Sequence, residues 1–561
     1  MGITAITIEN FKGILEPVRI ELKPITLLFG PNSAGKSTIV QALHYAHEIF
    51  ERNNTNPDTT LLGGDSIDLG GFEAMVHQHD KTKAIQIGFE IDLQKEDLPV
   101  YHDGFETFGT DYLDMAESGY LLDTISRVKE AVVDITIKWS EQLEKPYISS
   151  YMVKTNGSKL ITIDSSSDAL QIYISKINPF NPVFFDEGVN PEDVRQEFIR
   201  VLKQEDISSE VESEDSEDDI LSDNTGFTML SALMTYMKFE KGIPGLTQPI
   251  NLHRQNSALP RWEKNLVLDG GIWAENLEIE DEPNFTRLLS SLIVGPGELI
   301  RDELRKLCYV GPLREVPKRS HRPAFSSDDS RWSNGLAAYD TLFFSSEAFI
   351  DKVNEWMTQE ERLNSGYSVE IKKYRELGAD HPLMLALLQN RILDEDIDLR
   401  DQLLALPVMR RLLIRDEAKD IELAPQDIGV GISQVLPVIV AAMHHKTGLV
   451  VIEQPELHIH PAFQVALGDL FVEQVRTCPD LTFILETHSE HLLLRFLRRI
   501  RETGENEAPE NRTLIPEELS IYFIEQGDAG IVCKPIRVDR DGDFIDRWPH
   551  GFFDERAGEL F

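Results

Sequence analysis

Apolar and polar residues alternate along several segments of the first third of the chain. Such alternation is typical of strands that bury one face, and their close spacing predicts an antiparallel sheet. Two short strands around a turn are expected before them, at 3–8 and 18–22, and a closing hairpin near the end, at 519–525 and 531–538. The alternating segments are 83–93, 131–139, 147–153, 159–163 and 170–174.

Three other apolar runs are continuous, which is typical of strands buried on both faces. Each is followed by a stretch predicted to contain a helix, and repeated strand–helix units indicate a parallel sheet with helices on its faces. Ligands of such sheets bind at the carboxyl ends of the strands. Glu453, Gln454 and His488 fall at such ends. The three runs are 25–29, 448–453 and 481–486.

The middle of the chain has a different character. Residues 206–223 form an acidic, Ser-rich tract that cannot bury enough apolar surface to order itself. A solvated loop is one interpretation of this tract, and an interaction or DNA-mimicking segment is the other. Residues 283–307 and most of 342–415 are predicted to be helical.

The strongest chemical signal is Gly30-Pro-Asn-Ser-Ala-Gly-Lys-Ser37, which fits the phosphate-binding pattern G-x-x-x-x-G-K-[ST] between a strand and a helix. Gly30 and Gly35 let the backbone turn its N–H groups toward an anion, and the helix start adds its positive dipole end. Lys36 is expected to reach the β- and γ-phosphates of ATP, and the Ser37 hydroxyl to ligate Mg²⁺. The candidate binding residues of this loop are Gly30, Asn32, Ser33, Ala34, Gly35, Lys36, Ser37 and Thr38.

Charge narrows the choice of partners. The chain has a formal net charge of −41, which repels nucleic acid unless basic residues gather in one place. An acidic balance can also reflect a salt-rich environment, so DNA is not excluded. We find no signal-like segment at the start and no uncharged apolar run of about 18 residues, and we therefore expect a cytoplasmic protein that does not cross a membrane.

Together these motifs resemble those of ATP-binding-cassette-type heads, in the branch shared with chromosome-maintenance, recombination-repair and overcoming-lysogenization-defect ATPases. The version is similar to the AAA15/AAA21 group of bacterial ATPases, with an end similar to the uncharacterised DUF3696 domain. The motifs that carry the resemblance are 10–13 (NFKG), 30–37, 309–314 (YVGPLR), 429–437 (GVGISQVLP), 453–461 (EQPELHIHP) and 546–553 (DRWPHGFF).

The resemblance implies a fold of the α/β class, an ABC-type P-loop ATPase head. It would have a parallel sheet core, an antiparallel β subdomain and an inserted, largely helical region. We expect four units: an N-terminal ATPase lobe (1–177), an acidic and partly disordered insertion (178–300), a mostly helical middle region (301–420) and a C-terminal ATPase lobe (421–561).

The resemblance also assigns roles to single residues. Glu453 takes the position of the acid that supports Mg²⁺, together with Ser37. Gln454 stands where many relatives place the catalytic Glu, and His488 matches the strand-end His that senses the γ-phosphate. Glu for Asp at 453 is tolerable if a water bridges to the metal. Gln454 can orient water but cannot accept a proton, so slow hydrolysis is expected.

A second segment implies pairing of two copies. Gly429, Gly431 and Ser433 match the part of relatives that binds the γ-phosphate of the opposite subunit, so a head-to-tail homodimer with ATP between the heads is expected. Ser433 is also predicted to cap the helix that starts here. Glu456 is an alternative general base, although in the resemblance it is a structural acid of the loop after the strand.

Weaker patterns leave alternatives open. His458 and His460 near Glu453 suggest a metal site, but the family pattern explains them structurally. The segments 314–319 and 495–501 are basic, and either solvated surface or nucleic-acid contact would explain them.

Two functions are therefore weighed. The first is a nucleotide-gated regulator of a separate nuclease in antiphage defence, as in the Septu-type and retron-associated ATPases that this layout resembles. The second is a DNA-repair or recombination ATPase that acts directly on DNA, and it would need a basic channel. The acidic insertion, the Gln at 454 and the short stretch after His488 favour the first.

Overall fold

The structure is a computed structural model of the chain. It describes residues 2–94, 96–101, 121–186, 188–205, 237–240, 243–246, 249–268, 282–319, 323, 328–381, 384–385, 388, 404–528 and 530–549. The acidic tract predicted at 206–223 lies outside these residues. Among the described residues, no helix combines the length and the apolar character needed to cross a membrane.

One large sheet is built almost entirely from the N-terminal third of the chain, and all its neighbouring strands are antiparallel. The alternating segments of the sequence form these strands, so the predicted antiparallel sheet is confirmed. From edge to edge the strands are β14 (Val267–Leu268), β13 (Ile250–His253), β10 (Ile172–Ile177), β9 (Ser158–Ser165), β8 (Lys145–Thr155), β7 (Glu130–Ser140), β6 (Ile85–Asp92), β1 (Ile3–Glu9) and β2 (Val18–Glu21).

A second sheet brings both ends of the chain together. Its first five strands are parallel neighbours, and the last pairs antiparallel as the predicted closing hairpin. In order they are β15 (Cys308–Val310), β19 (Gly448–Glu453), β20 (Leu481–Glu486), β3 (Ile25–Phe29), β21 (Leu519–Gly527) and β22 (Gly530–Pro535). The carboxyl ends of β3, β19 and β20 therefore lie side by side, which is what the candidate site requires.

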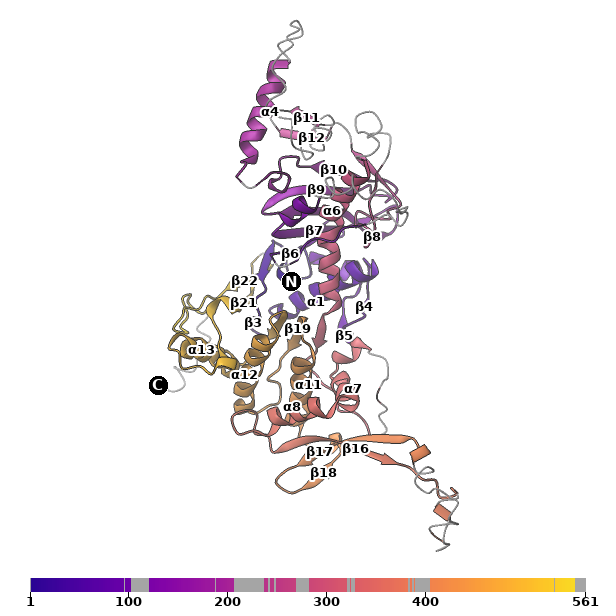
Figure 1. The fold of residues 1–561 in the computed structure, drawn as a ribbon, viewed down its shortest axis with the longest axis vertical. Coiled ribbons are helices and arrows are strands. Elements are labelled where there is room, and N and C mark those ends of the chain that lie inside the picture. The colour runs from indigo at the N-terminus through magenta and orange to yellow at the C-terminus, as the bar shows by residue number, and fades with distance from the viewer. Residues whose placement is uncertain are drawn as a thin grey trace, which may run out of the picture.

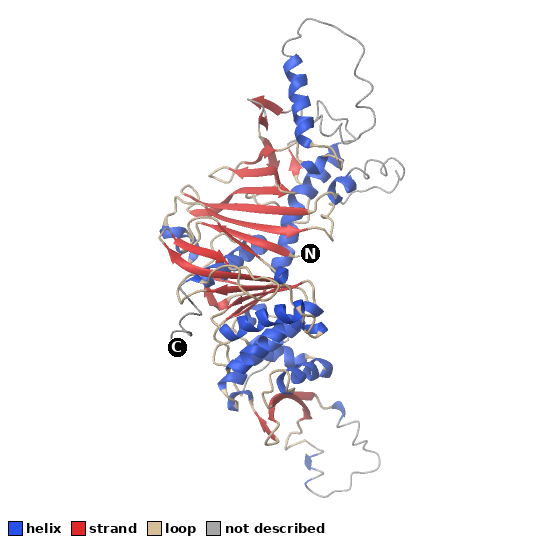
Figure 2. Cartoon of the chain, turned by 90° about the vertical axis from the view of Figure 1, so that its left-hand side faces the viewer, coloured by secondary structure: helices blue, strands red, loops and turns tan. Residues whose placement is uncertain are grey.

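The six-stranded sheet separates two hydrophobic cores, and alternate residues of each parallel strand enter different ones. On β3, Leu28 joins the core shared with the nine-stranded sheet, while Leu27 joins the core on the opposite face. Burial on both faces explains why these strands are continuously apolar. The helices divide in the same way, as Figures 1 and 2 show.

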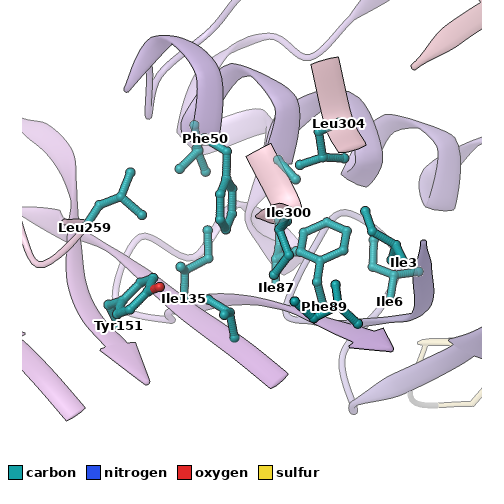
Figure 3. Close-up of a cluster of buried hydrophobic side chains, with 14 of the residues drawn as sticks. Ile3, Ile6, Phe50, Ile87, Phe89, Ile135, Tyr151, Leu259, Ile300 and Leu304 are labelled. Carbon is teal, nitrogen blue, oxygen red and sulfur yellow. The ribbon is translucent and has the colours of Figure 1, made fainter. Parts of the chain in front are cut away.

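The first core is filled by α1 (Lys36–Arg52) and α6 (Glu282–Arg305), which pack between the two sheets. In Figure 3, Phe50 of α1 and Leu304 of α6 lie near Phe89 of β6, and the rings of Phe50 and Phe89 meet edge to face at 5.9 Å. The second core is covered by α7 (Leu336–Phe344), α8 (Glu347–Thr358), α11 (Val430–His444), α12 (Pro461–Thr477) and α13 (Glu490–Gly504).

The region predicted to be mostly helical at 342–415 is only partly so, and this prediction is corrected. After α7 and α8 the chain forms β16 (Tyr367–Arg375) and β17 (Val408–Asp416), which pair antiparallel with each other, and β18 (Ile421–Leu423) extends the sheet. Their Lys, Arg, Glu and Leu residues are good helix formers, but pairing between strands decides the outcome. This small sheet lies below α8 in Figure 1.

Two predicted unit boundaries also differ from the structure. The helix α6 runs through residue 300 without a break, and β13, from the presumed insertion, pairs with β10 of the N-terminal sheet. Residue 420 lies between the paired strands β17 and β18. The remaining described strands and α-helices are the short hairpins β4 (Thr59–Thr60) with β5 (Gly64–Asp68) and β11 (Met237–Glu240) with β12 (Ile243–Leu246), and the helices α2 (Gly71–Met75) and α4 (Pro191–Glu205).

Candidate active site

The phosphate loop connects β3 to α1, as predicted. Gly30 has φ 150°, and a Cβ there would lie 2.1 Å from the carbonyl oxygen of Ile524 on β21, so glycine is required for this close approach. Gly35 has φ 99° and precedes the first helical residue, Lys36. Asn32 and Ser33 are exposed at the tip of the loop, whereas Ala34, Lys36 and Thr38 are buried.

Lys36 is held across the loop by its own backbone. Its Nζ donates to the carbonyl oxygens of Gly30 and Pro31, each at 3.0 Å, and the residue is 4% exposed. Burial lowers the pKa of Lys36, while the carboxylates of Glu486, Glu456 and Glu453 oppose that shift. The ammonium group is therefore already within the loop that would take the phosphates.

Two acids end neighbouring parallel strands beside this loop. Glu453 of β19 and Glu486 of β20 are the last register pair between those strands, and both are buried. Burial, and after it the adjacent Glu486 carboxylate, raises the pKa of Glu453 to about 7. Burial also raises the pKa of Glu486, against the hydrogen bond from Ser37 and the charge of Lys36.

The contacts of these acids differ. The Ser37 hydroxyl donates to Oε2 of Glu486 at 2.9 Å, and Oε1 of Glu486 lies 3.9 Å from the Lys36 Nζ. Glu453 instead accepts the Tyr309 hydroxyl at 3.1 Å. Sequence reasoning named Glu453 and passed over Glu486 and Tyr309. The sequence shows an acid at the end of the run 481–486, but it does not show that this acid lies in register with Glu453.

Gln454 and Glu456 lie in the loop after β19. Gln454 has φ 46°, and its backbone N–H donates to the carbonyl oxygen of Glu486 at 2.7 Å. Both carboxylate oxygens of Glu456 are bound, one by the Thr487 hydroxyl at 2.8 Å and one by the His488 backbone N–H at 2.6 Å. These bonds fasten the loop after β19 to the end of β20.

His488 has one polar atom without a partner. Its Nε2 is buried and makes no hydrogen bond within the described part of the chain. Burial lowers the pKa of His488, and the charge of Lys36 lowers it further, so the ring is neutral at pH 7. An orphaned ring nitrogen beside the phosphate loop fits contact with a bound phosphate.

The segment predicted to face a second subunit forms the start of α11, but the predicted helix cap is not the one observed. Gly429 is the cap residue, no side chain caps the helix, and Gly429 is exposed. Ser433 lies one turn inside the helix, is 2% exposed, and donates its hydroxyl to the Val430 carbonyl oxygen at 2.9 Å. The predicted capping role of the Ser433 side chain is therefore wrong, and its contact with a phosphate stays a prediction. Gly429 and Gly431 lie at the helix start, where backbone N–H groups generally lack partners within the helix and suit an anion.

Arg314 connects the start of α11 to the loop after β19. Its guanidinium donates to the carbonyl oxygens of Glu453 at 2.6 Å and Gln454 at 3.1 Å, while the Gln434 amide donates to the Arg314 carbonyl oxygen at 2.7 Å. The residue is 4% exposed, and burial lowers the pKa of Arg314 to about 10. It is therefore a structural cation, not part of a surface patch.

Most basic residues of the segments 314–319 and 495–501 contact acids or backbone oxygens of the described chain. Besides the buried Arg314, Arg319 pairs with Asp427 at 2.6 Å. In the second segment, Arg499 is buried against Asp469 at 2.7 Å, and Arg495 also pairs with Asp469. Pairing with acids removes most of the positive charge that the sequence suggested.

The residues present fit a nucleotide with Mg²⁺. The loop supplies a cradle too tight for side chains at Gly30 and Gly35, and the adjacent acids and Ser37 supply oxygen ligands. Within the described ranges, no group of three or more His, Cys, Asp and Glu side chains is placed to hold a metal ion alone. His458 and His460 are exposed and belong to no such group. Mg²⁺ is normally held by one or two carboxylates together with phosphate oxygens, which suits this arrangement.

A phosphate loop after a buried parallel strand, with acids and a His on the neighbouring strand ends, defines an ATPase of the P-loop class. A family model described as AAA ATPase domain matches residues 1–493, and one described as a protein of unknown function (DUF3696) matches residues 514–561. The chain belongs to this family of AAA ATPases and is an ATPase. The fold class and family expected from the sequence are thus confirmed.

Three solved structures are also similar over nearly the whole chain. An Smc head bound to the C-winged helix domain of ScpA is 9% identical with a TM-score of 0.35, covering 96% of this chain and 99% of its own. An Smc head from Pyrococcus furiosus, with an extended coiled coil and bound to the C-terminal domain of ScpA, is 10% identical (TM-score 0.34; 100% and 98% covered). The SMC head domain of Thermotoga maritima is 8% identical (TM-score 0.33; 96% and 100% covered). No curated protein matches the chain.

Proposed function

We propose that this ATPase is a slow, nucleotide-gated switch. Two copies pair head to tail around ATP and Mg²⁺, and the paired state controls a separate effector, a nuclease in antiphage defence. Lys36 and the loop N–H groups bind the phosphates, Ser37 and an acid hold the metal, and Gly429 and Gly431 meet the phosphates of the opposite copy. Any nucleic acid would be engaged through the effector or a separate surface.

The observation that carries the proposal is the state of the loop after β19. Gln454 stands directly after Glu453 and cannot accept a proton. Glu456 has both oxygens bound by Thr487 and His488. General-base assistance contributes about 10²–10⁴-fold to many reactions. Without it, hydrolysis is slow and the ATP-bound state lives long, which suits a switch better than a motor.

The test compares the lifetime of the pair with the rate of hydrolysis. We expect ATP with Mg²⁺ to convert the purified protein to a dimer, and the dimer to decay as its ATP is hydrolysed in a single turnover. A protein that hydrolyses ATP without changing its oligomeric state would contradict the switch.

Control of an effector, the second part of the proposal, is tested in cells. A strain carrying this gene with its neighbouring genes is challenged with phage, and protection is expected to disappear with Lys36→Ala. Protection that survives loss of nucleotide binding would rule out nucleotide gating.

A further inference from the structure

We infer that Glu486, at the end of β20, is the acid through which the phosphate loop holds Mg²⁺, and that Glu453 supports it from the neighbouring strand. The inference rests on the binding of Mg²⁺ and ATP within the proposed function, and not on the slow switch or its effector. Neither the sequence motifs nor the family match assigns a role to this residue.

Glu486 already contacts the side chain of the phosphate loop that is expected to ligate the metal. Ser37 is the side chain of the loop expected to ligate the metal, and its hydroxyl already donates to Oε2 of Glu486 at 2.9 Å. A hydroxyl and a carboxylate at hydrogen-bond distance are both oxygen donors, and small adjustments let both reach one cation. Glu453 has no such hydrogen bond with Ser37, and its Oε1 instead accepts the Tyr309 hydroxyl at 3.1 Å.

Glu486 also ends the strand that neighbours the phosphate-loop strand in the sheet. The strand β20 lies directly beside β3, and Glu486 is in register with Leu28, two residues before the loop begins. The strand β19 lies one strand further away, beyond β20. The acid on the adjacent strand is therefore nearer to the first loop residues than the acid on the next strand.

Acidic side chains are concentrated around the phosphate loop. The carboxyls of Glu453, Glu456 and Glu486 all interact electrostatically with Lys36, and those of Glu453 and Glu456 also interact with Arg314. Glu453 and Glu486 are neighbours, and two like charges at adjacent strand ends repel each other in a buried site. A divalent cation between the loop and these strand ends balances that charge.

Arg314 also explains why Glu453 takes the supporting role. The guanidinium binds the backbone carbonyl oxygen of Glu453 at 2.6 Å, and Tyr309 binds its side chain. These two contacts fix Glu453 to the β15 side of the site. Glu486 instead contacts the phosphate loop itself, through Ser37 and Lys36.

The experiment measures the affinity of a fluorescent ATP analogue with Mg²⁺ and with EDTA, for the wild type and for Glu486→Gln and Glu453→Gln. We expect Mg²⁺ to raise the affinity of the wild type about tenfold or more. Glu486→Gln should lose most of this gain yet keep its affinity in EDTA. Glu453→Gln, the matched variant on the next strand, should keep most of the gain.

A direct metal readout accompanies the titration. Mn²⁺ in place of Mg²⁺ gives an electron paramagnetic resonance signal, and we expect its binding with the nucleotide to weaken in Glu486→Gln more than in Glu453→Gln. Glutamine still accepts from Ser37, and thermal melting in EDTA checks that both variants fold. Glu486→Gln with an undiminished Mg²⁺ gain, or a larger loss in Glu453→Gln, overturns the inference. A wild type without any Mg²⁺ gain overturns the metal part of the proposed function as well.

Discussion

The guanidinium of Arg314 lies 2.6 Å from the backbone carbonyl oxygen of Glu453, and this contact ties the end of β19 to the segment that follows β15. The same side chain also binds the carbonyl oxygen of Gln454, and its backbone pairs with the Gln434 amide inside α11. One buried residue thus joins the acid-bearing strand end to the helix whose start is expected to meet a second subunit.

Replacing Arg314 should therefore affect stability and catalysis together. Arg314→Met removes the guanidinium donor from the carbonyl oxygens of Glu453 and Gln454, at a cost of roughly 2–4 kcal/mol in the free energy of unfolding. Denaturant unfolding and steady-state ATPase measure the two effects. Arg319→Met, at the exposed ion pair with Asp427, is the control and should change stability by less than about 1 kcal/mol. Equal effects of the two variants would contradict the structural role of Arg314.

Lys36→Ala should abolish nucleotide binding. The loop loses its only cationic side chain against the triphosphate, and no other residue of 30–38 carries a positive charge. The measurement is equilibrium binding of a labelled ATP analogue, with circular dichroism to show that the variant folds. Wild-type affinity in a folded variant would remove the site assignment.

Pairing of two copies is tested at Gly429. This residue has an ordinary φ of −61°, and a side-chain Cβ added there would have no heavy atom within 4 Å of it. Gly429→Ser and Gly429→Asp should both fold, and each should stabilise α11 by a few tenths of a kcal/mol as a better cap. Gly429→Asp places a negative charge where a partner's phosphate is expected, whereas Gly429→Ser does not.

Sedimentation with a non-hydrolysable ATP analogue should therefore show pairing for Gly429→Ser and its loss for Gly429→Asp, with nucleotide affinity of the single head unchanged in both. Equal pairing of the two variants would show that the start of α11 does not meet the phosphates of a second copy.

Mild acid should destabilise the protein partly through His445, which follows α11. Burial, then the charges of His444 and Lys446, lowers the pKa of His445 to about 4. The unfolded chain takes up a proton near pH 6.5 and the folded chain does not, so stability is lost as pH falls from about 6.5 to about 4. The contribution is at most about 3 kcal/mol.

His445→Gln removes this titration. The loss of melting temperature between pH 7 and pH 5 should be smaller in the variant than in the wild type. An unchanged pH dependence in His445→Gln would show that the histidine is not held neutral by its surroundings.

The fold was predictable where one short-range pattern decides the structure. Alternation indicated the antiparallel strands, and a glycine-rich motif between an apolar run and a helix indicated the phosphate loop. The strands β16 and β17 were missed because their residues suit either a helix or a strand. Pairing between segments far apart in the sequence decides which of the two forms. Glu486 was missed for a similar reason, since its contact with Ser37 follows from the order and register of parallel strands.

The predicted cap of α11 was wrong for a local reason. Serine is a residue type that often caps helices, but the helix begins three residues before Ser433, at Val430. Nothing in Gly429-Val-Gly-Ile breaks the first helical turn once that turn is packed against the core. Propensity alone disfavours a glycine such as Gly431 within the first turn of a helix. Packing of Ile432 and Val435 in the second core outweighs that preference.

The most informative substitution is at Gln454. Glutamine there can orient a water molecule but cannot deprotonate it, so turnover of the natural protein should be low. Gln454→Glu places a carboxylate at this position and should raise steady-state ATPase activity, within the roughly 10²–10⁴-fold range of general-base assistance, and shorten the life of the ATP-bound dimer.

Glu456→Gln is the matched variant two residues further on. Its carboxylate already accepts from Thr487 and His488, and the amide keeps only part of that bonding, so stability should fall by roughly 1–3 kcal/mol while the chemical step changes less than in Gln454→Glu. Steady-state ATPase on the three proteins, with unfolding measured in parallel, separates the two roles. If the wild type is already fast and Glu456→Gln abolishes its activity without unfolding it, Glu456 is the base and the slow switch is wrong.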